Sequence, residues 1–215
     1  MINTTLLGSL ISLTFLSIIT PGPSNIMMMS SSALFGWRRT IPLYLGINFG
    51  SGVLVTASVF GLGAILEAWP WLLFIAKLFG TLWLSFLSIK FFRNSFKDSN
   101  QIEAPENKKT VRPFYFYEGV LMQWANPKAI IVAIAIAAAF IDISDTPAKS
   151  LSVIVLIFIF IGMPTASTWL FLGNIINKFM SNEKYNKKFN FVMGWSILLT
   201  AFVILFGCKV TVLNI

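Results

Sequence analysis

The segment Thr20-Pro21-Gly22-Pro23-Ser24-Asn25 interrupts an apolar run that extends from Leu6 to Ala33. A proline inside a helix lacks the N–H that would bond to the carbonyl four residues earlier, and it costs about 3 kcal/mol in an intact helix. The two prolines therefore predict a break that frees the carbonyls of Ser17 and Ile19. Ser24 and Asn25 are predicted to cap the helix that restarts after the break.

The composition places this break in a membrane. Of 215 residues, 56% are hydrophobic and 11% are charged, and the mean hydropathy is +0.79. A chain of this kind is too apolar for an ordinary soluble domain. In a bilayer, free carbonyls are tolerated only where they are buried in protein or line a wet cavity. We therefore expect a membrane-spanning helix whose break lies either inside the protein or beside a wet cavity.

The sequence also narrows the chemistry. It has no histidine and one cysteine, Cys208, which argues against imidazole or thiolate metal sites, histidine-based catalysis and an intrachain disulfide. We predict no cofactor, no metal and no catalytic residue. The net charge of +8 comes from basic loops between apolar runs, so we predict no nucleic-acid partner.

Six apolar runs approach or exceed the length of about 20 residues that a helix needs to cross the hydrocarbon core. We predict spans at Leu6–Ala33, Ile41–Leu66, Trp69–Phe92, Phe114–Ile141, Leu151–Gly173 and Phe189–Gly207. The amino-terminal residues before Leu6 carry neither a basic region nor a plausible cleavage site, so the first run is expected to be kept as a span. The predicted fold class is all-α integral membrane.

Lys and Arg set the predicted orientation. Most of the 16 basic residues lie in the loops after the first, third and fifth spans. The positive-inside rule places these loops in the cytoplasm and both termini outside it.

The polar segment 94–112 divides the chain into two halves, 1–93 and 113–215, of three spans each. We predict that this segment is a cytoplasmic linker and that the halves are inverted repeats, because three spans on each side must run in opposite directions. The first helix of each half is interrupted, by Pro21-Gly22-Pro23 and by Asn126-Pro127. The third helix of each half carries an early glycine, Gly80 or Gly194.

The two interruptions are predicted to meet near the membrane midplane and to form a substrate site. Freed carbonyls give a negative end that suits an ammonium, and the restarted N-termini at Ser24-Asn25 and Asn126-Pro127 give positive ends that suit a carboxylate. An amino acid matches this pair of charges. Prolines that merely kink the helices for packing are the alternative.

Three polar side chains inside the spans are further candidates for substrate binding. Lys128 lies near the middle of its span and at a helix N-terminus, where both surroundings disfavour a cation. A substrate carboxylate would explain its position. Snorkelling, or bonds to carbonyls of neighbouring helices, is the alternative. For Lys77, substrate binding and snorkelling toward the outer interface are equal alternatives. Asn48 either lines the path or holds helices together.

Two carboxylates are candidates for carrying a coupling proton. Glu118 lies near the start of the fourth span and Glu67 near the end of the second. Solvation at the interface is the alternative for both. No acidic residue lies deep in any predicted span, so the sequence leaves the coupling ion unassigned. In the fifth span, Gly162-Met163-Pro164-Thr165 predicts a kink.

Four sets of residues follow one another along most of the chain: Thr20-Pro21-Gly22-Pro23; Gly36-Trp37-Arg38-Arg39 with Gly46 and Gly50; Lys77-Leu78-Phe79-Gly80 with Leu84; and Gly119 with Asn126-Pro127-Lys128-Ala129. In order and spacing they resemble the LysE/RhtB family of bacterial amino-acid exporters. The resemblance implies six helices, location in the bacterial cytoplasmic (inner) membrane, and efflux of amino acids or related molecules coupled to the proton gradient. Ser24 departs from the acidic or amide residue that many members carry there.

The predicted function is a secondary transporter that exports amino acids or similar small zwitterions by alternating access. Cation or metal efflux is the first alternative, although the absence of histidine argues against soft metals. An intramembrane enzyme is the second; serines and lysines are present, but the spans contain no deep carboxylate pair. The predicted partners are an amino-acid substrate and membrane lipids, and the sequence leaves a homo-oligomer open.

Overall fold

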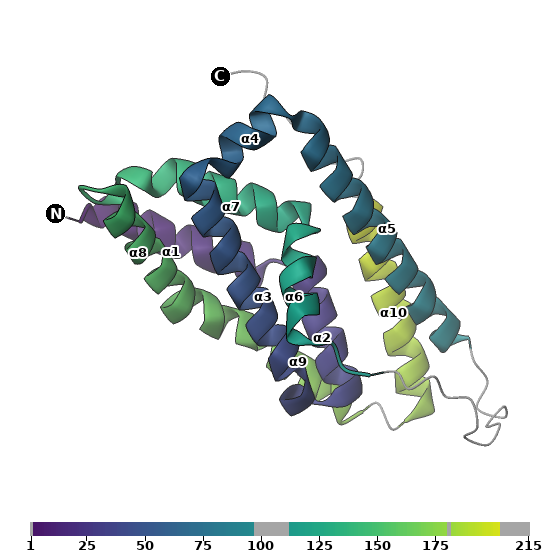
Figure 1. Cartoon of the computed structure of the whole chain (residues 1–215). Coiled ribbons are helices and arrows are strands. Elements are labelled where there is room, and N and C mark those ends of the chain that lie inside the picture. Colours follow the sequence, from purple (N-terminus) through teal and green to yellow (C-terminus); the bar gives the residue numbers. More distant parts are fainter. Residues whose placement is uncertain (1, 97–111, 180–181, 203–215) are drawn as a thin grey trace.

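The structure is a computed structural model that describes residues 2–96, 112–179 and 182–202. Within these ranges it leaves out the side chains of Glu67, Pro70, Leu73, Ala76, Lys77, Trp83, Leu87, Lys90, Glu183 and Thr200. The described elements are all helical (Figure 1). They are α1 (Thr4–Ile19), α2 (Pro23–Phe35), α3 (Trp37–Ala57), the π-helical turn η1 (Ser58–Leu62), α4 (Gly63–Ala68), α5 (Pro70–Ser95), α6 (Phe116–Trp124), α7 (Pro127–Phe140), the 3-10 turn η3 (Ile141–Ile143), α8 (Pro147–Ile157), the π-helical turn η4 (Phe158–Gly162), α9 (Met163–Asn177) and α10 (Glu183–Phe202).

Several of these helices are long and apolar enough to cross a membrane. Two lie at Trp37–Leu66, which is kinked at Phe60 and Gly61, and at Pro147–Asn177. Two more spans arise if each bent pair, α1 with α2 and α6 with α7, is one span. α5 and α10, which cover most of the third and sixth predicted spans, are 26 and 20 residues long. The described residues therefore support an all-α membrane protein.

The first helix is broken where its prolines predict. α1 ends at Ile19, α2 begins at Pro23, and the two helices are bent by 53°. The prediction that Ser24 and Asn25 cap α2 is wrong, because the N-cap is Gly22 and both residues lie inside the first turn. Pro23 takes the first helical position, where a missing N–H costs nothing.

The fourth helix is also broken, between Trp124 and Pro127, with a bend of 70°. Asn126 is the N-cap of α7, and its side-chain oxygen accepts a hydrogen bond from the N–H of Lys128 at 3.1 Å. Pro127 again occupies the first helical position. After both interruptions the helix restarts in the same way, with a proline directly after the N-cap residue.

Two further irregularities are η4, a π-helical turn, and η1, where non-helical backbone angles at Phe60 and Gly61 place a kink between α3 and α4. η4 ends at Gly162, the first residue of the segment Gly162-Met163-Pro164-Thr165, and the hydroxyl of Thr165 donates to the carbonyl of Ile161 at 2.6 Å. The helix stays continuous there, and a π-helical turn lies where the sequence predicts a kink. η1 was not predicted from the sequence. It contains Gly61 with a φ of +108°, a backbone conformation that favours glycine.

Small residues bring the helices close together. A Cβ added to Gly46 in α3 would collide with the carbonyl oxygen of Phe116 in α6, and one on Gly173 in α9 would collide with that of Met29 in α2. Such crossings are typical of membrane helices, where small residues let backbones approach. They fix α3 against α6 and α2 against α9.

α5 and α10 pack side by side along their length (Figure 1). Ser88 in α5 donates a hydrogen bond to the carbonyl of Gly194 in α10 at 2.9 Å, and Gly194 faces the ring of Phe92. Gly80 instead lies against the carbonyl of Ala125 at the second break. The two early glycines therefore make different contacts.

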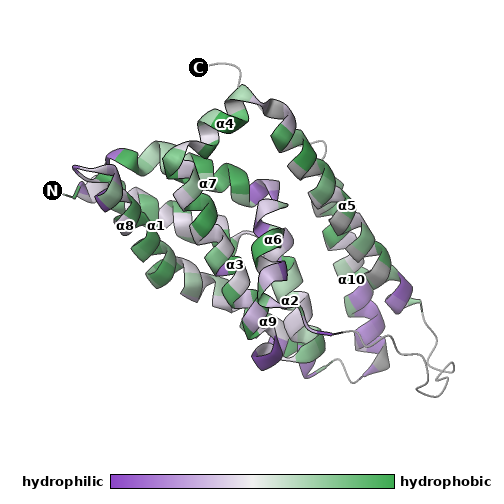
Figure 2. Cartoon of the chain, in the orientation of Figure 1, coloured by the Kyte–Doolittle hydropathy of each residue, from purple (hydrophilic) through white to green (hydrophobic). Residues whose placement is uncertain are grey.

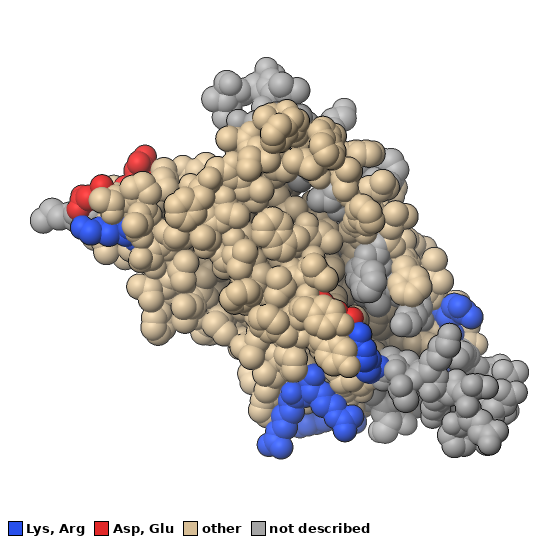
Figure 3. Space-filling view, viewed as in Figure 1, with Lys and Arg blue, Asp and Glu red and all other residues tan. Residues whose placement is uncertain are grey.

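The surface is apolar along the middle and charged at its ends. Hydrophilic segments lie at the lower ends of the helices in Figure 2, and another lies where α6 meets α7. In the view of Figure 3, Lys and Arg gather mainly at the lower end, and the broad surface between the ends is uncharged. A band of this kind suits the hydrocarbon core of a bilayer.

The α3–α6 crossing leads to a stability prediction. Gly46→Ala should lower the free energy of unfolding by about 1–3 kcal/mol, because the added methyl group overpacks the contact with the Phe116 carbonyl. Gly52→Ala is the matched control in α3, since among the described residues nothing lies within 4 Å of a Cβ at that position. Thermal unfolding of the detergent-solubilised protein, followed by tryptophan fluorescence, measures both. Equal unfolding temperatures for the two variants would contradict the close contact between α3 and α6 at Gly46.

Candidate functional site

A cavity of about 80 Å³ lies between the two helix breaks. This is several times the roughly 10–15 Å³ that a cavity needs to hold one water molecule, so the cavity has room for more than one. Both broken helices, α3, η4 and α9 contribute to its wall: Ser17, Ile18, Gly22, Ser24, Asn25, Ile47, Asn48, Ser51, Val55, Gln123, Asn126, Lys128, Ala129, Val132, Ala133, Phe158 and Ala166.

The carbonyls at the end of α1 are satisfied by side chains from elsewhere in the chain. The amide nitrogen of Asn25 donates to the carbonyls of Ile18 at 2.7 Å and Thr20 at 2.9 Å. The indole of Trp169 in α9 also donates to Ile18, at 3.2 Å. The carbonyl of Ser17 accepts a bond from the hydroxyl of Thr20 at 3.0 Å. The side chain of Asn25, at the start of α2, thus holds the C-terminal end of α1 in place.

Lys128 completes this cluster from the second break. Its ammonium donates to the carbonyl and the hydroxyl of Thr20, both at 2.9 Å, and more weakly to the carbonyl of Pro21 at 3.4 Å. The side chain lies across Gly22, where a Cβ would come within 3.2 Å of Nζ. The ammonium therefore leaves the unfavourable N-terminus of its own helix and reaches the negative C-terminus of α1.

A directed chain of hydrogen bonds links the two breaks to α3. Asn126 donates to the hydroxyl of Ser24 at 2.9 Å, and that hydroxyl donates to the side-chain oxygen of Gln123. The amide of Gln123 donates to the hydroxyl of Ser51, which donates to the carbonyl of Ile47. The side chains of Ser24, Gln123 and Ser51 each accept a hydrogen bond from one neighbour and donate one to the next. Such an arrangement strengthens each bond.

The rest of the cavity wall is apolar. Val55 in α3, Val132 and Ala133 in α7, Phe158 in η4 and Ala166 in α9 all line it. Among the described side chains that line the cavity, Lys128 is the one charged group. The site thus has a polar part at the two breaks and an apolar part formed by the neighbouring helices.

The predicted site residues divide into three groups. Gly22, Ser24, Asn25, Asn48, Asn126 and Lys128 line the cavity. Pro21, Pro23 and Pro127 shape the breaks beside it. Lys77 lies in α5 and Glu67 in α4, but their side chains lie outside the described part of the structure.

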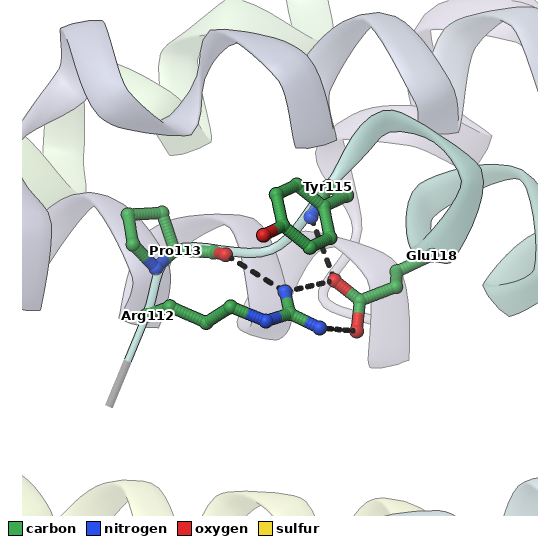
Figure 4. A network of polar contacts seen from close by, with 4 residues as sticks. All are labelled: Arg112, Pro113, Tyr115 and Glu118. Atoms are coloured by element: carbon green, nitrogen blue, oxygen red, sulfur yellow. Dashed lines mark hydrogen bonds and ion pairs between the residues drawn. The ribbon is translucent and has the colours of Figure 1, made fainter. Parts of the chain in front are cut away.

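Glu118 lies at the start of α6 and does not line the cavity. Its carboxylate forms a two-pronged ion pair with Arg112, at 2.7 and 3.0 Å, and accepts the N–H of Tyr115 at 2.6 Å (Figure 4). The hydrogen bond to Glu118 raises the pKa of Arg112 above its ordinary value. In this structure Glu118 caps a helix.

The sequence analysis singled out neither Gln123 nor Ser51 as a site residue. Gln123 is 5% exposed and bridges Ser24 in α2 to Ser51 in α3. In the sequence, Gln123 is recognisable as a neutral amide within an apolar run, three residues before Asn126. Polar groups at membrane depth usually have a partner and a function.

A second hollow lies on α9, lined by Ile19, Thr168, Trp169, Phe171, Leu172 and Ile175. No charged residue is among its lining residues. The cavity at the breaks is the better candidate, because it combines carbonyls, amides, hydroxyls and an ammonium.

The family model of the LysE type translocators matches residues 15–212, and so includes both breaks and every cavity residue. The chain belongs to this family. No solved structure matches it significantly.

Three relatives show how far the similarity extends. The membrane protein YrhP of Bacillus subtilis, described as uncharacterized, is 27% identical over 200 residues, which cover 88% of this chain and 92% of YrhP. The uncharacterized membrane protein PA4757 of Pseudomonas aeruginosa is 28% identical over 129 residues, 58% of this chain and 59% of the relative. A leucine efflux protein of Enterobacter sp. is 24% identical over 132 residues, 60% of this chain and 61% of the relative. The chain thus matches about three fifths of the latter two.

The hydrogen-bond chain leads to a prediction about stability. Gln123→Leu should cost about 1–3 kcal/mol of the free energy of unfolding, because it removes the Gln123 partner of the buried Ser24 hydroxyl and of the half-buried Ser51 hydroxyl. Asn48→Leu is the control. It removes only a bond to the carbonyl of Tyr44 in the same helix and should cost less. Thermal unfolding in detergent compares the two variants, and an equal or smaller loss for Gln123→Leu would rule out a stabilising bridge.

Proposed function

We propose that the protein exports a neutral amino acid with an apolar side chain, such as leucine, from the bacterial cytoplasm by proton-driven alternating access. The observation that carries this proposal is the cavity between the two breaks, which combines a carbonyl cluster with an apolar wall. Membership of a translocator family supports transport over catalysis.

The two ends of the first break match the two charges of an amino acid. The C-terminus of α1 presents the carbonyls of Thr20 and Pro21, which suit an ammonium. Three residues further on, α2 begins at an N-cap, Gly22, that makes no side-chain capping bond. The N-terminus of a helix suits a carboxylate.

The apolar part of the cavity favours an aliphatic side chain. Val55, Val132 and Phe158 would contact it, and each buried methylene contributes about 0.8 kcal/mol. A lysine or arginine substrate would place a second cation beside Lys128, with no carboxylate among the described lining residues to balance it. The relatives named as leucine efflux proteins are consistent with this preference.

The proposal includes a topology of six spans. Residues 1–93 and 113–215 form two inverted three-helix repeats joined by the cytoplasmic linker 94–112, and both termini lie outside the cytoplasm in the inner membrane. Two features support it: the first helix of each half is broken, and the third helices, α5 and α10, pack together. The two repeats then supply one break each to a shared site.

Uptake into inverted vesicles tests the function. With an imposed proton gradient, we expect labelled leucine, isoleucine and valine to accumulate, and lysine and glutamate to accumulate far less. Vesicles without the protein and wild-type vesicles without the gradient are the controls. Failure of folded wild-type protein to accumulate any amino acid would contradict the proposal and favour cation efflux.

A cavity-filling variant tests the position of the side-chain pocket. Ala133→Leu should lower uptake of leucine at least tenfold and reduce uptake of alanine much less, because the added atoms occupy the apolar part of the cavity; tenfold corresponds to about 1.4 kcal/mol. Ala139→Leu is the control, since Ala139 is exposed on the same helix. Equal effects of both substitutions would place the substrate elsewhere.

A further inference from the structure

The ammonium of Lys128 occupies the place that the proposed function assigns to the substrate. It bonds to the carbonyl and hydroxyl of Thr20 and to the carbonyl of Pro21, and these acceptors form the C-terminal end of α1. An amino-acid ammonium at the same carbonyls would meet the Lys128 ammonium at contact distance. Two like charges this close repel strongly inside a protein.

The acceptors that hold Lys128 are all neutral. Hydrogen bonds between an ammonium and neutral oxygens are weaker than bonds to a carboxylate. The acceptors that the described residues offer this ammonium thus include no carboxylate that would hold the proton on the amine. Gly22 lets the Lys128 side chain lie where it does, because a Cβ at this position would come within 3.1 Å of the Cδ of Lys128.

The helices around Lys128 do not supply a carboxylate partner among the described side chains. α1, η1, α2 and α9 contain no titratable residue. In α3 the hydroxyl of Tyr44 donates to the carbonyl of Met163, and in α6 Glu118 is paired with Arg112. The other charged or titratable residues of the elements packed around α7 are Arg38, Arg39, Glu67, Lys77, Lys90, Arg93, Tyr117, Asp142 and Lys149, and none of them lines the cavity.

We propose that Lys128 is the coupling residue, and that its ammonium and the substrate ammonium take turns on the carbonyls of Thr20 and Pro21. This inference rests on the proposed function. Substrate binding from the cytoplasm displaces the Lys128 amine, whose proton passes to cytoplasmic water. After the substrate leaves on the outside, the amine takes a proton from outside water and returns to the carbonyls. Each cycle moves one amino acid out and one proton in, so the inward proton gradient drives export.

Leucine binding to the detergent-solubilised wild type tests this exchange directly. Calorimetry in buffers of different ionisation enthalpy should show that about one proton is released for each leucine bound while Lys128 is protonated. In the same pH range, the Kd should rise about tenfold for each unit that the pH falls, as linkage requires for one released proton. Binding with no proton release and a constant Kd from pH 6 to 9 would overturn the inference.

Two substitutions of the lysine make opposite predictions. Lys128→Met leaves the carbonyls open, so leucine should bind without proton release and without pH dependence. Lys128→Arg keeps a cation that cannot lose its proton, so leucine should bind at least tenfold more weakly than to wild type. Lys149→Met, at an exposed position in the first turn of α8, is the control and should keep wild-type proton release. Thermal unfolding and size-exclusion elution check that each variant is folded.

Several results would contradict the exchange while leaving the proposed function intact. Proton release that persists in Lys128→Met would assign coupling to another group. Loss of leucine binding in folded Lys128→Met, or wild-type affinity in Lys128→Arg, would show that the two ammoniums do not compete. If wild type binds and transports no neutral amino acid at all, the proposed function itself fails. If a variant does not fold, the wild-type proton release and pH dependence decide.

Discussion

The carbonyl groups at the end of α1 are the constraint on which the rest of the site depends. A helix that stops inside a membrane exposes acceptors that lipid cannot satisfy. In this protein Asn25, Trp169 and Lys128 reach them from α2, α9 and α7. The break in the first helix is therefore stabilised by contacts between distant parts of the chain, and its bonds also hold both broken helices around one cavity.

The polar and apolar parts of the cavity have different structural origins. The polar part comes from backbone ends and from the chain of bonds that joins Asn126, Ser24, Gln123 and Ser51. The apolar part comes from helices that glycines allow to pack closely, as Gly46 does in α3. A neutral hydrogen-bond chain fixes the geometry without adding charge. Lys128 is thereby left as the charged group among the described residues of the cavity wall.

The sequence predicts the parts of this structure that depend on local backbone chemistry. Pro21, Pro23 and Pro127 predict where the helices break, since each removes a helical N–H, and the lengths of the apolar runs predict the helices. The prediction that Ser24 and Asn25 cap the second helix is wrong, because Pro23 favours the first helical position and makes Gly22 the N-cap. Contacts between distant residues were beyond local rules. Gln123 has no sequence pattern that names Ser24 and Ser51 as its partners. The position of Lys128 suggested an anionic partner, whereas the structure places its ammonium on carbonyls.

The central claim is that the two breaks form one site in which substrate and Lys128 bind the same carbonyls. An experimental structure of the protein with bound leucine tests it most directly. The account predicts leucine in the cavity between α1 and α7, with its ammonium on the carbonyl of Thr20, its side chain against Val132 and Phe158, and the Lys128 amine moved away. Leucine bound in the hollow on α9, or in the cavity with Lys128 still on Thr20, would contradict it.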